Sequence, residues 1–451
     1  MQSDIGRNKQ SIIKMSWPIF VEIFLQMLVG NVDQFMISQY SQPSVAAVGN
    51  GNQIMNIIII LLTVMSTATT ILIAQYLGAK NQEKISEVCT VSLLFNGLFG
   101  LVSSVLLITF HRQLFVWLQV PTEIMDETSI FFSIIASGIV VQGLYFSFVA
   151  SFRGYSWMKT TMVVSSVMNV LNIFGNWLLI YGFWNIPAMG VAGVAISTTI
   201  SKVIGLVIIY YIFRKHLGVK ISLKYLRPFP WQSLKRILYI GIPSGGETLS
   251  YQLSQTTIMK MVNAFGLIVI NTKVYVTIVV MFAYIYALAI SAAMQIVVGY
   301  LIGSNNFEEV GKKVWYTMRI SLLACTGLTA LLYLGSDYVL GIFTTDSAVL
   351  KLGKTILFIE IFLEIGRAIN IVMVRALQAA GDIKTPVTVG IVCMWSIAVG
   401  LSYLLGVVME MGLVGIWIAM ATDECVRAVI FIYRWRSGAW KNKKLIESTA
   451  G

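Results

Sequence analysis

Long apolar segments alternate with short polar breaks along almost the whole chain. A helix needs about 20 apolar residues to cross the hydrocarbon core of a bilayer, and each of these segments reaches that length. The pattern therefore predicts twelve transmembrane helices. They lie near residues 12–38, 44–78, 88–110, 124–152, 160–184 and 190–213, and then near 236–263, 267–302, 313–335, 350–380, 384–408 and 412–433.

A polar, basic connection separates the two sets of six segments; it reads RKHLGVKISLKYLRPFPWQSLKR. We expect an N-terminal six-helix lobe over residues 1–214, a cytoplasmic connection over 215–235 and a C-terminal six-helix lobe over 236–451. The predicted fold is an all-α integral membrane protein made of two six-helix bundles. The basic connection also suits contact with anionic lipid at the membrane surface.

The two halves repeat at a constant offset of 225 residues. Pro18 matches Pro243, Glu22 matches Glu247, and the loop QYLGAKNQEK matches GYLIGSNNFEE. Six helices is an even number, so both copies enter the membrane from the same side. The repeats are then parallel, with a pseudo-twofold axis along the membrane normal. In transporters built this way, substrate and ion sites lie near the midplane between the halves.

Composition and charge support a membrane protein. Charged residues make up 12% of the chain and hydrophobic residues 57%, against about 25% and about 45–50% in soluble domains. The net charge of +12 would suit nucleic acid, but Lys and Arg gather in alternate connections, as the positive-inside rule requires. We therefore expect no nucleic-acid partner, and a multi-pass protein of the plasma (inner) membrane with both termini in the cytoplasm.

The residues show no pattern typical of an enzyme. Both histidines, His111 and His216, lie in connections, and no nucleophile elbow, zinc pair or phosphate loop is present. The four cysteines lie singly in apolar surroundings, without the spacing of a disulfide framework or a metal site. We expect no enzymatic activity and no cofactor.

The polar residues inside the first six segments are candidates for function, with Glu22 and Gln26 as a second coupling group or part of the substrate cavity. An acid at the centre of a membrane helix costs at least about 2.5 kcal/mol, yet the first segment carries Glu22, Gln26 and Asp33 on one helical face. Asp33 has no cation nearby on its own helix, and a buried carboxylate without one either takes up a proton or binds a cation. Both outcomes suit a proton- or sodium-coupled transporter. Asn172 and Asn176 share another face, where structural hydrogen bonding is the alternative.

The second half carries its own intramembrane acids. Glu247 follows Pro243 by one turn, among small residues that would leave it in a cavity. Two further groups have acids and an arginine at helical pairing distance. Such self-neutralised groups favour a structural or gating lock, with a free ion site as the alternative. These groups are Glu360, Glu364 and Arg367, and Asp423, Glu424 and Arg427.

Four segments together resemble the multidrug and toxic compound extrusion (MATE) family: VDQFMISQYSQPSVAAVGNGNQ, GAKNQ, NIFGNWLLIYG and RALQAAGDIKTP. The resemblance covers essentially the whole chain and is nearest to the NorM-like bacterial branch. It implies a twelve-helix secondary antiporter that expels small cationic or amphipathic compounds in exchange for H+ or Na+. It also implies alternation between outward- and inward-facing states, and we expect a monomer with no ligand beyond its substrates, lipid and the coupling ion.

The resemblance assigns roles to residues of the first half. Asp33 falls where the family has its carboxylate on the first helix, and Asn172 and Asn176 fall on the pair of the fifth helix. Thr198 falls on the hydroxyl of the sixth helix. The resemblance therefore implies a cation-coupling site, for a proton or for Na+, at these four residues.

In the second half, Glu247 falls on the NorM-type acid of the seventh helix, as a second coupling group or as part of the substrate cavity. Arg367 stands where NorM-like members place an aspartate. A flippase for lipid-linked saccharides is the alternative in this superfamily, and it would need cations to hold a pyrophosphate. The mid-helix cations are Lys202, Arg367 and Arg427, and acids lie at pairing distance from both arginines, which favours the antiporter.

Overall fold

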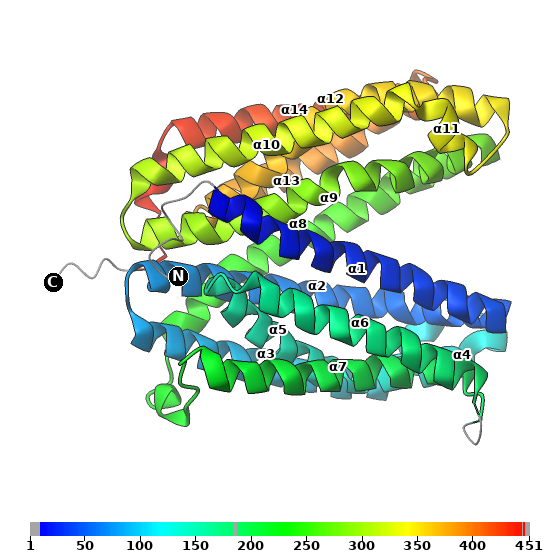
Figure 1. The fold of residues 1–451 in the computed structure, drawn as a ribbon. Coiled ribbons are helices and arrows are strands. Elements are labelled where there is room, and N and C mark those ends of the chain that lie inside the picture. Colours follow the sequence, from blue (N-terminus) through cyan, green and yellow to red (C-terminus); the bar gives the residue numbers. More distant parts are fainter. Residues whose placement is uncertain (1–9, 184–186, 444, 447–451) are drawn as a thin grey trace. The chain divides into compact units, whose positions relative to one another are not determined.

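The computed structural model describes residues 10–183, 187–443 and 445–446, and these residues confirm the all-α fold (Figure 1). The first half contains α1 (Gln10–Tyr40), α2 (Gln42–Gly78), α3 (Gln82–Trp117), α4 (Met125–Ser137), α5 (Ile139–Gly154), α6 (Met158–Tyr181) and α7 (Gly190–His216). The second half contains α8 (Trp231–Asn263), α9 (Leu267–Gly303), α10 (Phe307–Leu334), α11 (Ser336–Gly341), α12 (Ser347–Ala379), α13 (Lys384–Cys393) and α14 (Gly412–Arg436).

Each predicted membrane segment corresponds to one helix or to two consecutive ones. The fourth segment is α4 followed by α5, bent by 42° at Gly138. The eleventh is α13, which continues through two π-helical stretches, so that Lys384–Val408 forms one span. In the described part of the chain, eight helices are long and apolar enough to cross a membrane, and the bent pair makes a ninth. The remaining three segments are α8, α12 and α14, which are as long but carry more polar and charged residues.

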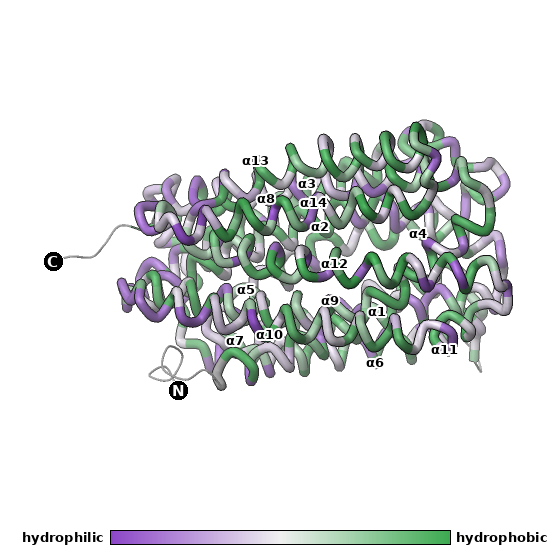
Figure 2. Tube along the Cα trace, turned by 90° about the horizontal axis from the view of Figure 1, so that it is seen from above, coloured by the Kyte–Doolittle hydropathy of each residue, from purple (hydrophilic) through white to green (hydrophobic). Residues whose placement is uncertain are grey.

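The outer surface of the helices suits lipid. Hydrophobic residues occupy the middles of the helices, and hydrophilic residues gather towards their ends (Figure 2). Along α3, the apolar side chains of Leu98, Leu101 and Val105 are 52%, 51% and 55% exposed. Soluble monomers rarely expose an apolar surface of this extent, so these side chains are placed to contact acyl chains.

Contacts between residues group the chain into two compact units. The N-terminal unit is Val21–Ile242, and the C-terminal unit comprises the described residues of Met1–Phe20 and Pro243–Gly451. The divisions therefore fall inside α1 and α8, close to Pro18 and Pro243, whereas we expected a division at the 215–235 connection. A proline inside a helix removes one backbone hydrogen bond and favours a kink. Each of these two helices thus begins in one unit and continues in the other.

Side-chain contacts hold the first turns of α1 and α8 in their units. At the start of α8, the Ser233 hydroxyl donates a hydrogen bond to Glu87 Oε1 at 2.5 Å. The beginning of α1 belongs to the other unit, where the rings of Phe20 and Tyr286 meet edge to face at 6.2 Å. The N-terminal unit packs its own core around Phe115 and Phe132.

Candidate ion-coupling site

The centre of the candidate site is a hydrogen bond between α1 and α6 in the N-terminal unit. Asn176 Nδ2 donates to Asp33 Oδ1 at 2.5 Å. Asp33 is half-buried, and none of the described residues forms an ion pair with it within 4.0 Å. The structure thus brings together the carboxylate and the amide that the resemblance pairs.

One turn earlier on α6, Asn172 contacts α7. Asn172 Nδ2 donates to Thr198 Oγ1 at 3.1 Å, and the Ser197 hydroxyl donates to the Asn172 backbone carbonyl at 2.9 Å. Gly175 permits this close approach, because a Cβ at that position would lie 2.4 Å from Ser197 Oγ. Small residues commonly let membrane helices pack this tightly. All four residues predicted for the site, Asp33, Asn172, Asn176 and Thr198, therefore lie in one row across α1, α6 and α7.

Two oxygen atoms in this row lack a partner. Asn172 Oδ1 and Asn176 Oδ1 are buried and accept no hydrogen bond from the described residues. A buried acceptor left unsatisfied costs about 1–3 kcal/mol. Together with the Asp33 carboxylate, these oxygens form a set of acceptors that suits a proton or a hard cation, since hard cations take oxygen ligands.

Lys202 adds a positive charge near this row. It lies on α7 one turn after Thr198, and its charge interacts electrostatically with that of Asp33. The sequence shows Lys202 as a mid-helix cation but does not connect it with Asp33, because the two lie on different helices. The signal in the sequence is that Lys202 follows Thr198 by four residues, so that Thr198 and Lys202 share one face of the helix.

Glu22 and Gln26 do not join Asp33. The buried carboxylate of Glu22 pairs with Arg153 at 2.9 Å and accepts a hydrogen bond from Thr161 at 3.3 Å. The Gln26 side chain is exposed. Arg153 belongs to the last turn of α5, one residue beyond the segment predicted near 124–152. Glu22 is therefore part of an ion pair, and Asp33 is the acid of α1 without one.

Glu247, the repeat partner of Glu22, has a different environment. Its Oε1 lies 3.0 Å from the position that a Cβ at Gly390 of α13 would take, and its charge interacts with that of Arg427 without a contact ion pair among the described residues. The residue 225 positions after Arg153 is Gln378, which donates to Ser244 Oγ at 3.3 Å. The C-terminal unit thus lacks the arginine that neutralises Glu22.

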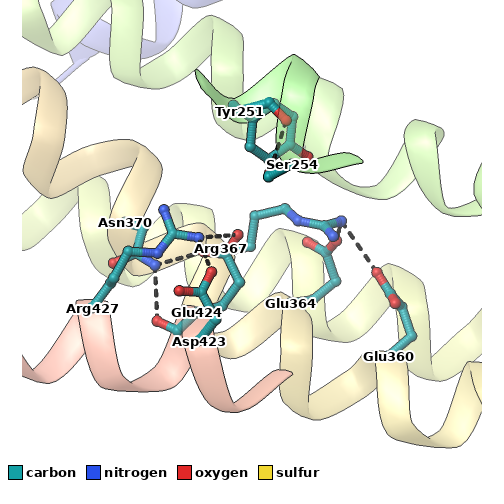
Figure 3. A network of polar contacts seen from close by, with 9 residues as sticks. All are labelled: Tyr251, Ser254, Glu360, Glu364, Arg367, Asn370, Asp423, Glu424 and Arg427. Atoms are coloured by element: carbon teal, nitrogen blue, oxygen red, sulfur yellow. Dashed lines mark hydrogen bonds and ion pairs between the residues drawn. The ribbon is translucent and has the colours of Figure 1, made fainter. Parts of the chain in front are cut away.

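A charged network joins α12 and α14 in the C-terminal unit (Figure 3). Arg367 pairs with Glu360 at 3.1 Å and, more closely, with Glu364, and its guanidinium lies 5.0 Å from the centre of the Tyr284 ring. Trp417 Nε1 donates to the other carboxylate oxygen of Glu360. These contacts contain the pairs that helical spacing predicts for this segment.

The second half of the network is centred on Arg427. It pairs with Asp423 at 2.5 Å and with Glu424 at 2.8 Å, and Asn370 donates to Glu424 Oε2 at 2.6 Å. Gly366 lets α12 approach α14, because a Cβ there would lie 2.6 Å from the Glu424 carbonyl carbon. Across Figure 3, four carboxylates face two guanidinium groups. The network is therefore not self-neutralising when every acid is ionised.

The two helical units, the lipid-facing surface and the intramembrane acids define a multi-pass membrane transporter. The chain belongs to the MatE family, that is, multidrug and toxic compound extrusion, because the family model MatE matches residues 18–178 and again residues 243–404. The two matches begin at Pro18 and Pro243, the pair that marks the 225-residue repeat. The internal repeat is thus confirmed as two copies of one family unit.

Relatives and solved structures agree with this assignment. The uncharacterized transporter YisQ of Bacillus subtilis is 36% identical over 433 residues, covering 96% of this chain and 95% of that protein. The probable multidrug resistance protein NorM of Thermotoga maritima is 25% identical over 450 residues, covering 99% and 96%. A MATE protein solved in a bent conformation superposes with a TM-score of 0.90 at 22% identity, covering 98% of each chain. An outward-facing multidrug resistance MATE family transporter of the MOP superfamily gives 0.88, also at 22% identity, covering 97% of this chain and 98% of that one.

Proposed function

We propose that this transporter is a cation-coupled antiporter that exports small organic cations and amphipathic compounds in exchange for H+ or Na+. The observation that carries the proposal is the Asp33–Asn176 hydrogen bond inside a row of unsatisfied oxygens. A membrane-embedded carboxylate without an ion pair, beside two orphaned amide oxygens, is suited to bind and release a small cation. The names of relatives such as the probable multidrug resistance protein NorM support export of drugs.

The coupling step acts on the packing of α1 in the N-terminal unit. When a proton or Na+ reaches Asp33, the carboxylate loses its net charge and its hydrogen bond with Asn176 changes. Asn172 and Thr198 remain neutral partners that keep α6 and α7 together. Because α1 contributes Asp33 and contains Pro18, which favours a kink, ion binding biases α1 between two packings. Access to the two sides of the membrane then alternates, as in other two-repeat transporters.

Glu247 is a second coupling group or a substrate contact in this proposal. Its carboxylate lies beside Gly390 and has no contact ion pair among the described residues. The four acids around Arg367 and Arg427 outnumber the two guanidinium groups, and this surplus favours organic cations electrostatically when the acids are ionised. Orientation with both termini in the cytoplasm remains part of the proposal, supported by the distribution of Lys and Arg.

Ion-driven transport by the purified protein tests the proposal. The protein is reconstituted into liposomes, and ethidium flux is recorded under an imposed proton gradient and then under an imposed sodium gradient. We expect at least one of the two gradients to drive ethidium against its concentration gradient. Flux that both gradients leave unchanged would contradict ion-coupled antiport.

A flippase for lipid-linked saccharides is less well supported. Arg367 and Arg427 are each bound to two acids, so neither presents an unpaired charge to a pyrophosphate. Expression in a drug-sensitive strain and in a strain with a cell-envelope defect separates the two functions. Drug resistance without rescue of the envelope supports the antiporter, and rescue without resistance supports the flippase.

A further inference from the structure

Lys202 is a cation in the middle of a membrane helix for which the proposed coupling step has no role. An ammonium group in this position is costly unless it finds a partner. Within the described part of the chain, its Nζ makes no hydrogen bond and no ion pair within 4.0 Å. The nearby charge with which it interacts is that of Asp33.

The geometry of α7 directs Lys202 towards the oxygen row. Side chains on an α-helix lean towards its N-terminus, so that a side chain covers the turn before its own Cα. For Lys202 that turn holds Thr198, about 6 Å away along the axis, and Thr198 is bonded to Asn172. A lysine side chain of four methylenes can therefore bring its ammonium to the level of Asn172.

The acceptors that lack donors among the described residues begin at that level with Asn172 Oδ1. They continue one turn further along α6 with Asn176 Oδ1 and the Asp33 carboxylate oxygen that Asn176 does not contact. A lysine ammonium offers three donors and no acceptor. The three donors of the ammonium group therefore match the three acceptor oxygens in number and in kind.

We propose that the Lys202 ammonium is a tethered cation that competes with the coupling ion for the oxygen set of Asp33, Asn172 and Asn176. This inference rests on the proposed function, since it assigns the coupling ion to Asp33. The ammonium and the ion then exclude each other, and an arriving ion must displace the lysine. Lys202 is in this sense a positioning residue: it keeps Asp33 compensated after the ion leaves and limits how tightly the ion binds.

A double-mutant cycle tests whether the two charges act as a pair. The thermal midpoint Tm of unfolding is measured in detergent, in sodium-free buffer at one pH, for the wild type, Asp33→Asn, Lys202→Met and the double variant. Residues that interact directly give non-additive effects, so we expect the double variant to be more stable than the two single losses predict. Lys273→Met is the matched control, because it removes an ammonium near the start of α9 in the C-terminal unit, whose hydrogen-bond partner among the described residues is the sulfur of Met259. Its effect should add to that of Asp33→Asn, and additive effects for Lys202→Met would overturn the inference.

Protection by Na+ alone tests the displacement. Losing the tethered competitor should lower the Na+ concentration that half-maximally raises Tm by about 5- to 150-fold in Lys202→Met, the usual range of coupling between two ligands. Lys202→Arg keeps the charge and should stay close to the wild type. An unchanged Na+ requirement in Lys202→Met, or the same change in Lys202→Arg, would contradict a tethered cation. Failure of the proposed function is distinguished separately, because neither the proton gradient nor the sodium gradient would then drive ethidium transport by the wild type, whatever the cycle shows.

Discussion

Asn176 donates a hydrogen bond to Asp33 at 2.5 Å and so joins α1 to the α6–α7 pair. The repeat gives this contact no counterpart, because the position 225 residues after Asp33 is Ile258, which is fully buried in the core of the C-terminal unit. The two units share a scaffold but not this carboxylate. The chemistry of Asp33 therefore belongs to the N-terminal unit alone.

Substituting Asn176→Ala tests the importance of this hydrogen bond. A hydrogen bond to a charged group contributes about 1.5–3 kcal/mol, so we expect the rate of ion-driven ethidium transport to fall by about tenfold or more. Asn50→Ala is the control, because among the described residues Asn50 donates only to a backbone carbonyl of its own helix, in an exposed hydrogen bond. Equal transport by the two variants would show that the amide of Asn176 does not act on Asp33.

The paired glutamates Glu22 and Glu247 should differ in their effect on stability. Glu22→Gln leaves the Arg153 guanidinium without its partner, and we expect a loss of about 1–3 kcal/mol in the free energy of unfolding. Glu247→Gln breaks no contact ion pair in the part of the chain that the structure describes, and it should cost less. Thermal unfolding of both variants in detergent measures the difference, and a larger loss for Glu247→Gln would contradict the structural role given to Glu22.

Arg367 should be essential for the stability of the C-terminal unit. Arg367→Met leaves Glu360 and Glu364 buried without their cation, and breaking a buried pair from one side costs about 3–5 kcal/mol. Arg436→Met removes an exposed arginine that lies over the Trp315 ring and should cost no more than about 1 kcal/mol. The comparison is made by thermal unfolding, and equal losses would show that the Arg367 network does not stabilise the unit.

Gly175 should be required for the contact between α6 and α7. In Gly175→Ala the new methyl group would lie 2.4 Å from Ser197 Oγ, so either Ser197 must give up its hydrogen bond to the Asn172 carbonyl or α6 and α7 must separate. Overpacking of this kind costs about 1–3 kcal/mol, and transport should fall with stability. Gly30→Ala, which has nothing within 4 Å of its new methyl group, should retain both. Normal transport by Gly175→Ala would mean that the site tolerates a wider spacing.

The sequence was sufficient to predict the helices because lipid imposes a simple rule. Each spanning segment must be apolar and about 20 residues long, and every predicted segment corresponds to a helix or to consecutive helices. The bend at Gly138 and the change of unit within α1 and α8 were not predicted. They depend on how neighbouring helices pack, which hydropathy alone does not report.

The sequence predicted which site residues lie together when they share one helix or when the family resemblance pairs them. Step counting placed Asn172 beside Asn176, and the resemblance connected both with Asp33. Contacts between distant helices were missed, above all that of Arg153 with Glu22 and the charge of Lys202 near Asp33. Spacing along the chain does not show which faces of two separate helices meet.

The most direct test of the coupling site is ion-driven transport by Asp33→Asn. The substitution keeps the size and one acceptor oxygen of the side chain but removes its charge. Asp126→Asn is the matched control, because Asp126 pairs with Arg112 at 2.9 Å at an exposed position of the same unit. We predict that Asp33→Asn abolishes ethidium transport driven by the imposed ion gradient while Asp126→Asn transports like the wild type. Undiminished transport by Asp33→Asn would contradict the assignment of the coupling ion to Asp33.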